Sequence, residues 1–424
     1  SNCLPDLHKG RWVRCTLTEH RLGVWLNDTP VGQLNLTRNN GCEFRLLESY
    51  KNAYPRPILG QQFVDDPDQV YSSRQRTPPW FSNLPPEGPL RDLIARQAGV
   101  SVYREFFLLH HLGDDLPGAV CILADEAIPE SAGESRSATD AHPPKGEWRF
   151  SLAGVQLKFS ALREGRGMTI PVSGIGGDWI VKLPDSRFPG VPENEFATMR
   201  WAEASGITIP EIELIPVAEI SGLPPEASTI AAGQKALAVR RFDRTSAVKR
   251  VHIEDFAQIL GLYPEQKYDK FNYETLANLV YKLAGESELE EFIRRLVFVV
   301  ASGNGDVHLK NWSLIYPDGV HAKLSPAYDF VSTIQYKADD QLALKLARSK
   351  RWQDVTRESF LRLARKIGED ETRVAGFLDH AIESIMDVWH TSRSDLGYSA
   401  PALDGISDHL ARVPLFSART SRPR

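Results

Sequence analysis

The chain has 424 residues, of which 42% are hydrophobic and 25% charged, with a formal net charge of −5 and an isoelectric point near 6.2. These values predict a globular protein of two or three domains and exclude a chain that coats nucleic acid through its overall charge. The longest apolar stretch is shorter than the roughly 20 residues of a membrane span, and the N-terminus lacks a secretory pattern. The four cysteines have no ligand-like spacing, so we expect free thiols in a reducing, cytoplasmic compartment.

The first 124 residues predict a small unit of strands and helices. Strand patterns at 22–26 and 31–36 are joined by Asn27 and Asp28, which favour a hairpin turn. After a proline-rich stretch, two helical patterns end at Gly99 and Gly113. We expect this N-terminal subdomain to be β-rich.

Residues 125–147 are rich in Ser, Pro, Glu and Gly and poor in large apolar side chains. Such a composition cannot bury enough surface to offset the entropy of ordering, so it predicts a mobile linker and a domain boundary.

Two further lobes are predicted after the linker. Strand patterns dominate 148–245, with one helix near 194–206, and helical patterns dominate 246–424, with one hairpin at 311–324. The expected fold class is therefore α+β, with two lobes, an extra N-terminal subdomain and an all-helical C-terminal lobe.

The most informative stretch is GNGDVHLKNWSLIY, at 303–316. An amphipathic helical pattern precedes it and a strand follows, so both ends of a polar loop are anchored. The loop contains Asp306, His308, Lys310 and Asn311, and the chain returns after the hairpin with Asp329. Carboxylate and amide oxygens are the ligands that Mg²⁺ prefers. An Asp, an Asn five residues later and a second Asp reproduce a kinase layout, in which the first Asp accepts a proton and the other two residues hold metal.

Residues upstream of this loop complete the layout. Lys182 ends an apolar strand, from which its ammonium group can reach ATP phosphates. Glu193 or Glu195 on the next helix is a candidate to orient Lys182. Phe242, in VRRFDR, falls where a kinase hinge lines the adenine pocket.

The stretch SLAGVQLKFS, at 151–160, resembles a P-loop only distantly, because it has one glycine and no Lys-Ser/Thr pair. We interpret it as a flexible loop that covers phosphates. Gly154 lets the backbone approach the ligand, and Lys158 adds charge.

Structural alternatives remain for each residue taken alone. Asp and Asn are common in loops because they cap backbone groups, strand lysines often face solvent, and Phe242 is also typical of a core. A zinc site from His308, His321 and Asp329 is a weaker interpretation, because the two histidines lack close helical spacing.

Six motifs in this order resemble the HipA family, the serine/threonine kinase toxins of bacterial HipBA toxin–antitoxin modules. They are SLAGVQLKFS, WIVKLP, VRRFDR, HIEDFAQILG, GNGDVHLKNWSL and SPAYDF. FSNLPPEG and LHHLGDDLPGAV are similar to the family's N-terminal signatures, so the resemblance covers most of the chain. Gly305 is a departure, since the family often has a polar residue there.

The resemblance implies a role for each matching residue. Asp306 would be catalytic, Asn311 and Asp329 would hold Mg²⁺, and Ser151 would be autophosphorylated, which silences the enzyme. The residues implied at the ATP site are Ser151, Ala153, Gly154, Val155, Gln156, Lys158, Lys182, Arg240, Phe242, His308, Lys310 and Tyr328. Family members can carry an acidic residue at the Arg240 position.

The resemblance also implies partners. A HipB-like helix-turn-helix antitoxin would bind this chain, and the pair would bind operator DNA, associate with the nucleoid and co-repress the operon. The implied substrate is an aminoacyl-tRNA synthetase, typically the glutamyl enzyme. Three basic clusters are candidates for DNA contact, although solvated helix faces are often this charged. They comprise Lys345, Arg348, Lys350 and Arg351, then Arg362, Arg365 and Lys366, then Arg419, Arg422 and Arg424. A pseudokinase-like corepressor and a small-molecule kinase remain as alternatives.

Overall fold

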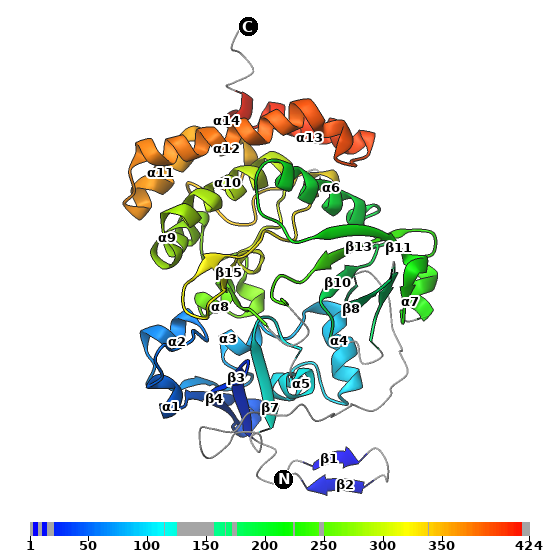
Figure 1. The fold of residues 1–424 in the computed structure, drawn as a ribbon, viewed down its shortest axis with the longest axis vertical. Helices are drawn as coiled ribbons and strands as arrows, with labels where there is room; N and C mark the ends of the chain where they lie inside the picture. The colour runs from blue at the N-terminus through cyan, green and yellow to red at the C-terminus, as the bar shows by residue number, and fades with distance from the viewer. Residues whose placement is uncertain are drawn as a thin grey trace.

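The computed structural model describes residues 3–6, 11–14, 21–113, 115–124, 157–165, 167–171, 176–223, 225–245, 250–337 and 339–417 (Figure 1). The predicted linker at 125–147, the loop residues at 151–156 and the arginines of the C-terminal tail lie outside these ranges.

The N-terminal part contains a five-stranded antiparallel sheet with the strand order β6-β5-β4-β3-β7. Its strands are β3 (Arg21–Leu26), β4 (Thr29–Leu36), β5 (Cys42–Leu46), β6 (Tyr71–Ser73) and β7 (Val120–Ala124). The predicted hairpin turn is confirmed, and Asn27 adopts a left-handed φ of 48° there. The helices are α1 (Glu48–Lys51), α2 (Gln61–Asp65), α3 (Pro79–Ser82), α4 (Gly88–Gln97) and α5 (Glu105–Leu112). A separate hairpin pairs β1 (Cys3–Asp6) with β2 (Arg11–Arg14).

The second sheet has six strands in the order β11-β13-β10-β8-β9-β12. They are β8 (Lys158–Glu164), β9 (Gly167–Thr169), β10 (Trp179–Lys182), β11 (Ile212–Pro216), β12 (Ile220–Ser221) and β13 (Lys235–Arg240). Two helices accompany them, α6 (Val191–Ala204) and α7 (Pro225–Ile230). Lys182 of β10 lies opposite Lys158 of β8 in the antiparallel register, so both side chains project from the same face.

The C-terminal lobe is helical apart from a three-stranded sheet. The predicted hairpin forms from β15 (Ser313–Tyr316) and β16 (Lys323–Leu324), and β14 (His252–Asp255) pairs with β15 as an additional strand. The helices are α8 (Phe256–Ile259), α9 (Tyr273–Ala284), α10 (Glu286–Ser302), α11 (Arg357–Ile367), α12 (Glu371–Ser392), α13 (Ala400–Arg412) and α14 (Pro414–Ser417). Figure 1 places α11 to α13 at the end of the molecule opposite the N-terminal sheet.

Three hydrophobic clusters stabilise these parts, one within 22–122, one within 157–238 and the largest within 199–416. The segregation of strands and helices confirms the α+β class. The largest cluster includes the apolar face predicted for α10, and all of that face is buried. Its members are Phe292, Ile293, Leu296, Val297 and Val300. Among the described residues, no helix has both the length and the apolar character of a membrane span.

Candidate active site

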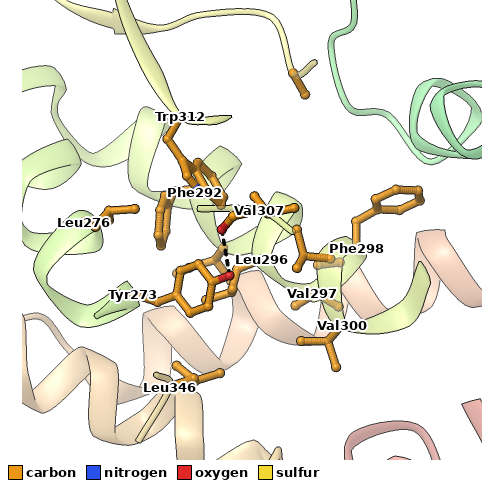
Figure 2. Packing of buried hydrophobic residues seen from close by; sticks show 14 of the residues in the cluster. Tyr273, Leu276, Phe292, Leu296, Val297, Phe298, Val300, Val307, Trp312 and Leu346 are labelled. Carbon is orange, nitrogen blue, oxygen red and sulfur yellow. Dashed lines mark hydrogen bonds between the residues drawn. The ribbon is translucent and has the colours of Figure 1, made fainter. Parts of the chain in front are cut away.

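The loop between α10 and β15 is attached rigidly to the largest core. Helix α10 ends at Gly303, where φ is 61° and an added Cβ would lie 2.6 Å from Ile334, so glycine is required. The Tyr273 hydroxyl donates to the Val307 carbonyl at 3.0 Å, as Figure 2 shows among the packed side chains. The polar side chains of the loop therefore project from a fixed backbone.

Gly305 lies in close contact with the segment that follows Asp329. Its N–H donates to Thr333 Oγ1 at 2.6 Å, and a Cβ at this position would overlap the carboxylate of Asp340. Any larger residue at this position would therefore require the Asp340 carboxylate to move.

Asp306 accepts a hydrogen bond at Oδ1 from the Tyr268 hydroxyl, at 2.6 Å. Its own N–H donates to Asn304 Oδ1 at 3.1 Å, which fixes the backbone. Burial raises the pKa of Asp306 above its ordinary value, while the Tyr268 hydrogen bond opposes that rise. The carboxylate is thus a stronger proton acceptor than an exposed one. Tyr268 was not predicted, and no motif marks it.

Lys182 is buried between two carboxylates. From the end of β10, its ammonium donates to Oε1 of Glu195 on α6 and to Oδ1 of Asp329. Burial alone would lower the lysine pKa, but Asp329 and Glu195 raise it above its ordinary value, so the ammonium stays charged. The structure therefore selects Glu195 as the orienting carboxylate; Glu193 lies in the first turn of α6 and lines a separate cavity.

Asp329 adopts a left-handed backbone conformation, with φ 57°. Its Oδ2 accepts a hydrogen bond from Asn311 Nδ2 at 3.3 Å and lies 3.5 Å from Lys158 Nζ. Burial opposes ionisation, but Lys158 and Lys182 hold the pKa of Asp329 well below its ordinary range. Asp329 is therefore an ionised oxygen donor beside an amide.

His308 is buried next to these groups and orients the loop. Its ring Nδ1 accepts from the Lys310 N–H at 3.3 Å, and its backbone N–H donates to Asn311 Oδ1 at 3.2 Å. The ring also packs edge-on against Tyr268, with centroids 4.9 Å apart. Burial and Lys267 lower the pKa of His308 to about 3, so the ring is neutral. A neutral ring fits a hydrogen-bonding role in the loop.

The structure directs Lys310 away from Asp329. Its ammonium binds Asp255 Oδ2 at 2.8 Å and Asn83 Oδ1 at 2.9 Å. Asn83 belongs to the FSNLPPEG stretch, and Glu87 of the same stretch pairs with Lys267 at 2.7 Å. The N-terminal stretch therefore contacts the loop between α10 and β15 directly.

The VRRFDR stretch leads from β13 towards the C-terminal lobe. Arg240 is exposed and pairs with Glu211 at 3.1 Å. The Phe242 ring packs 5.7 Å from that of Tyr328, whose hydroxyl donates to the Lys310 carbonyl at 2.8 Å. Phe242 and Tyr328 thus lie together beside the loop between α10 and β15, whereas the Arg240 side chain contacts Glu211, the residue before β11.

Sequence reasoning missed a buried charge network next to this stretch. Arg241 binds Asp115 at 3.0 Å and Asp243 at 3.0 Å, and Arg244 binds Asp243 at 2.8 Å. Asp115 also accepts from the Gly176 N–H at 2.7 Å. The signal was present in the sequence, since VRRFDR combines arginines with an aspartate and Asp115 lies in LHHLGDDLPGAV.

Five predicted residues, Ser151, Ala153, Gly154, Val155 and Gln156, lie outside the described residues. The residues proposed for a zinc site do not assemble. His321 pairs with Asp318 at 2.6 Å on an exposed turn, and within the described ranges no three His, Cys, Asp or Glu side chains form a group suited to a metal.

The donor set fits the group that a kinase requires. Asp329 offers carboxylate oxygens, and Asn311 lies beside it, with Nδ2 turned to Asp329 Oδ2 and Oδ1 accepting from the His308 N–H. Lys158 and Lys182 offer two positive charges within reach of the same carboxylate. Hard oxygens suit Mg²⁺, and paired ammonium groups suit phosphates. Asn311, Asp329, Lys158 and Lys182 are therefore the residues that would hold Mg²⁺ and ATP phosphates.

Comparison with known proteins identifies the family. Residues 150–389 match the model of the HipA-like C-terminal domain, and residues 22–123 match that of the HipA N-terminal domain. The protein Y4dM of Sinorhizobium fredii is 42% identical over 404 residues, which cover 93% of this chain and 97% of the relative.

More distant relatives agree with this match. The serine/threonine-protein kinase toxin HipA of Shewanella oneidensis is 27% identical over 300 residues, covering 62% of this chain and 65% of the relative. The solved Shewanella oneidensis complex of HipA, HipB and operator DNA contains a chain that matches 95% of this one with a TM-score of 0.66 and 19% identity, which shows a shared fold. The chain belongs to the HipA family of kinase-like proteins.

Proposed function

We propose that this chain is an ATP- and Mg²⁺-dependent serine/threonine protein kinase and the toxin of a toxin–antitoxin module. The observation that carries the proposal is the buried Lys182, held between Glu195 and Asp329 while Asn311 contacts the second oxygen of Asp329. A lysine–glutamate ion pair joined to a metal-holding Asp is the arrangement that protein kinases need for phosphoryl transfer.

Each residue has a stated task in this proposal. Lys182 and Lys158 bind phosphate oxygens, and Glu195 holds the Lys182 ammonium in place. Asp306, whose pKa is raised by burial, would accept the proton of the acceptor hydroxyl as that oxygen bonds to the γ-phosphorus of ATP and the bond from that phosphorus to ADP breaks. Bound Mg²⁺ and ATP supply charge neutralisation and the phosphoryl group. Phe242 and Tyr328 would border the nucleotide; Arg240 pairs with Glu211, and Lys310 pairs with Asp255.

Autophosphorylation at Ser151 is part of the proposal and is supported by the family membership. A phosphate on Ser151 carries a charge of about −1.5 to −2 and is incompatible with ATP phosphates at the same lysines. Ser151→Ala is expected to remove this label and prolong activity. Equal labelling of the variant, located by mass spectrometry, would rule the switch out.

The partners belong to the same proposal. The solved complex that shares this fold contains HipA, HipB and operator DNA, which supports a HipB-like antitoxin and joint repression of the operon. Direct DNA contact by this chain has less support, because Arg365 pairs with Glu358 and Glu371, and Lys350 donates to the Tyr268 carbonyl. An aminoacyl-tRNA synthetase, of the glutamyl type, is the proposed substrate.

The test compares cells that express the wild-type chain with cells that express Asp306→Asn. Growth arrest and new phosphoserine or phosphothreonine on one synthetase are expected only with the wild type. Growth arrest by both chains would favour a corepressor that acts without catalysis. A wild-type chain that labels small metabolites and no protein would indicate a small-molecule kinase.

A further inference from the structure

A buried amide joins α6 to the segment that follows Asp329. Asn194, which is 5% exposed, accepts at Oδ1 from the Ser332 N–H at 3.0 Å and donates from Nδ2 to the Ser332 carbonyl at 3.0 Å. Nδ2 also donates to the Tyr336 hydroxyl at 3.2 Å. Because Ser332 presents both a donor and an acceptor, only an amide satisfies both groups at once.

This contact closes a ring with the ion pairs of the site. Glu195, the residue after Asn194, binds Lys182, and Lys182 binds Asp329. Ser332 lies three residues after Asp329, so α6 holds the Asp329 segment at two points. Asp329 has a positive φ, a conformation that costs a non-glycine residue energy and persists only where the surroundings fix it.

We propose that Asn194 is a positioning residue for phosphoryl transfer, because it fixes the Ser332 backbone and thereby the Asp329 carboxylate relative to Lys182 and Asn311. The inference rests on the proposed kinase function, to which it adds a residue that touches neither nucleotide nor acceptor. Groups that orient a metal-holding carboxylate typically change metal affinity or activity by about 10- to 100-fold when removed.

The surroundings of the amide give the segment room to move. Asn194 and Tyr336 line a cavity of about 850 Å³, whose wall also includes Ile334 and Asp340 of the same segment. If the hydrogen bonds of the Asn194 side chain are lost, the segment after Asp329 is therefore free to move into the cavity that it lines. A variant at Asn194 is expected to keep its fold and displace the segment.

The test uses two variants and a matched control. Asn194→Ala removes the amide, and Asn194→Asp keeps its shape but places an acceptor against the Ser332 carbonyl. Arg200→Ala, the control, removes a 3.1 Å hydrogen bond from the same helix to the Asp395 carbonyl and leaves the hydrogen bonds of Asn194 in place. Hydrogen exchange of the amides at 329–336 is measured without nucleotide, and phosphorylation is measured against Mg²⁺ concentration.

Both Asn194 variants are expected to show faster exchange at 329–336 and a half-saturating Mg²⁺ concentration raised by about 10- to 100-fold, while Arg200→Ala matches the wild type. Unchanged exchange, or activity that falls only with the folded fraction at an unchanged Mg²⁺ requirement, would overturn the role of Asn194 and leave the kinase function standing. A wild-type chain without phosphoryl transfer would refute the kinase function and this role with it.

Discussion

Asp306 and Asp329 ionise differently because their neighbours differ. Burial raises the pKa of Asp306, whereas Lys158 and Lys182 overcome burial and lower the pKa of Asp329. Carboxylates whose pKa values are driven apart in this way are suited to separate tasks, one to accept a proton and one to stay ionised. The roles proposed for the two aspartates follow this difference.

Tyr268→Phe tests the role of Asp306 through pH. The Tyr268 hydrogen bond stabilises the ionised carboxylate, so its loss raises the pKa of Asp306 further. Since the ionised form accepts the proton, the acidic limb of the kcat/KM profile is expected to move to higher pH. Tyr281→Phe is the control, because its side chain interacts with Glu369 on another surface. If the acidic limb of Tyr268→Phe lies at the same pH as that of the wild type, the limb does not report the ionisation of Asp306.

For single residues, the sequence predicted which side chains lie near one another, but it did not predict where every side chain points. Spacing identified Asp306, Asn311 and Asp329, and the structure places Asn311 and Asp329 in contact. Lys310, in the same loop, instead binds Asn83 and Asp255. The direction of a long flexible side chain depends on partners distant in sequence, which local spacing does not contain.

Among the elements, the connection after β13 joins three parts of the fold. Arg241 is 8% exposed and contacts Asp115 of the N-terminal part and Asp243 of its own stretch, whereas its neighbour Arg240 is 50% exposed. Burial opposes the charge of Arg241, but the two carboxylates raise its pKa. The network therefore holds the connection in one position.

Two adjacent arginines provide a matched pair of variants. Arg241→Ala removes a positive charge that neutralises the buried carboxylates of Asp115 and Asp243. It is expected to lower the unfolding free energy by about 3–5 kcal/mol. Arg240→Ala removes an exposed pair, which is worth at most about 1 kcal/mol. Urea denaturation measures both changes. Equal effects of the two variants would show that the network does not stabilise the fold.

Element prediction succeeded where local patterns are strong. The amphipathic pattern of α10, the turn at Asn27 and the hairpin within 311–324 were predicted correctly. β14 was not predicted, because its four residues carry no strand pattern of their own and it forms by pairing with β15. Tertiary pairing overrides local propensity in such short strands.

At the scale of the whole molecule, the N-terminal part packs on the C-terminal lobe through buried polar contacts. Glu254 of β14 accepts from Trp80 Nε1 at 2.9 Å, from the Gln61 N–H at 3.1 Å and from the Tyr316 hydroxyl at 3.0 Å. Burial raises the pKa of Glu254 to about 8. The contact between the two parts is therefore sensitive to pH.

Glu254→Gln tests this sensitivity. In the unfolded chain Glu254 loses its proton near its ordinary pKa of 4.5, whereas in the folded chain it keeps the proton up to about pH 8. The folded state therefore binds one more proton between these two values, and the unfolding free energy falls as pH rises through this window. The nearby His252, whose pKa burial lowers to about 4, acts in the opposite direction only below about pH 6.5. Between about pH 6.5 and 8, Glu254 contributes a fall in the wild-type unfolding free energy that approaches 1.4 kcal/mol per pH unit, and Glu254→Gln is expected to lack this contribution.

Urea unfolding at several pH values measures the two slopes. Glu219→Gln, at an exposed carboxylate, is expected to keep the wild-type slope. Parallel curves for wild type and Glu254→Gln would show that Glu254 is already ionised in the folded chain.

The most direct test of the account is phosphate transfer from labelled ATP by the purified chain, with and without Mg²⁺. The wild type is expected to transfer label only with Mg²⁺, and Lys182→Met is expected to lose transfer because Glu195 and Asp329 lose their shared cation. Lys235→Met, at an exposed lysine on the neighbouring strand β13, is expected to behave like the wild type. Transfer by Lys182→Met at the wild-type rate would contradict the assignment of Lys182, Glu195 and Asp329 as the centre of a kinase site.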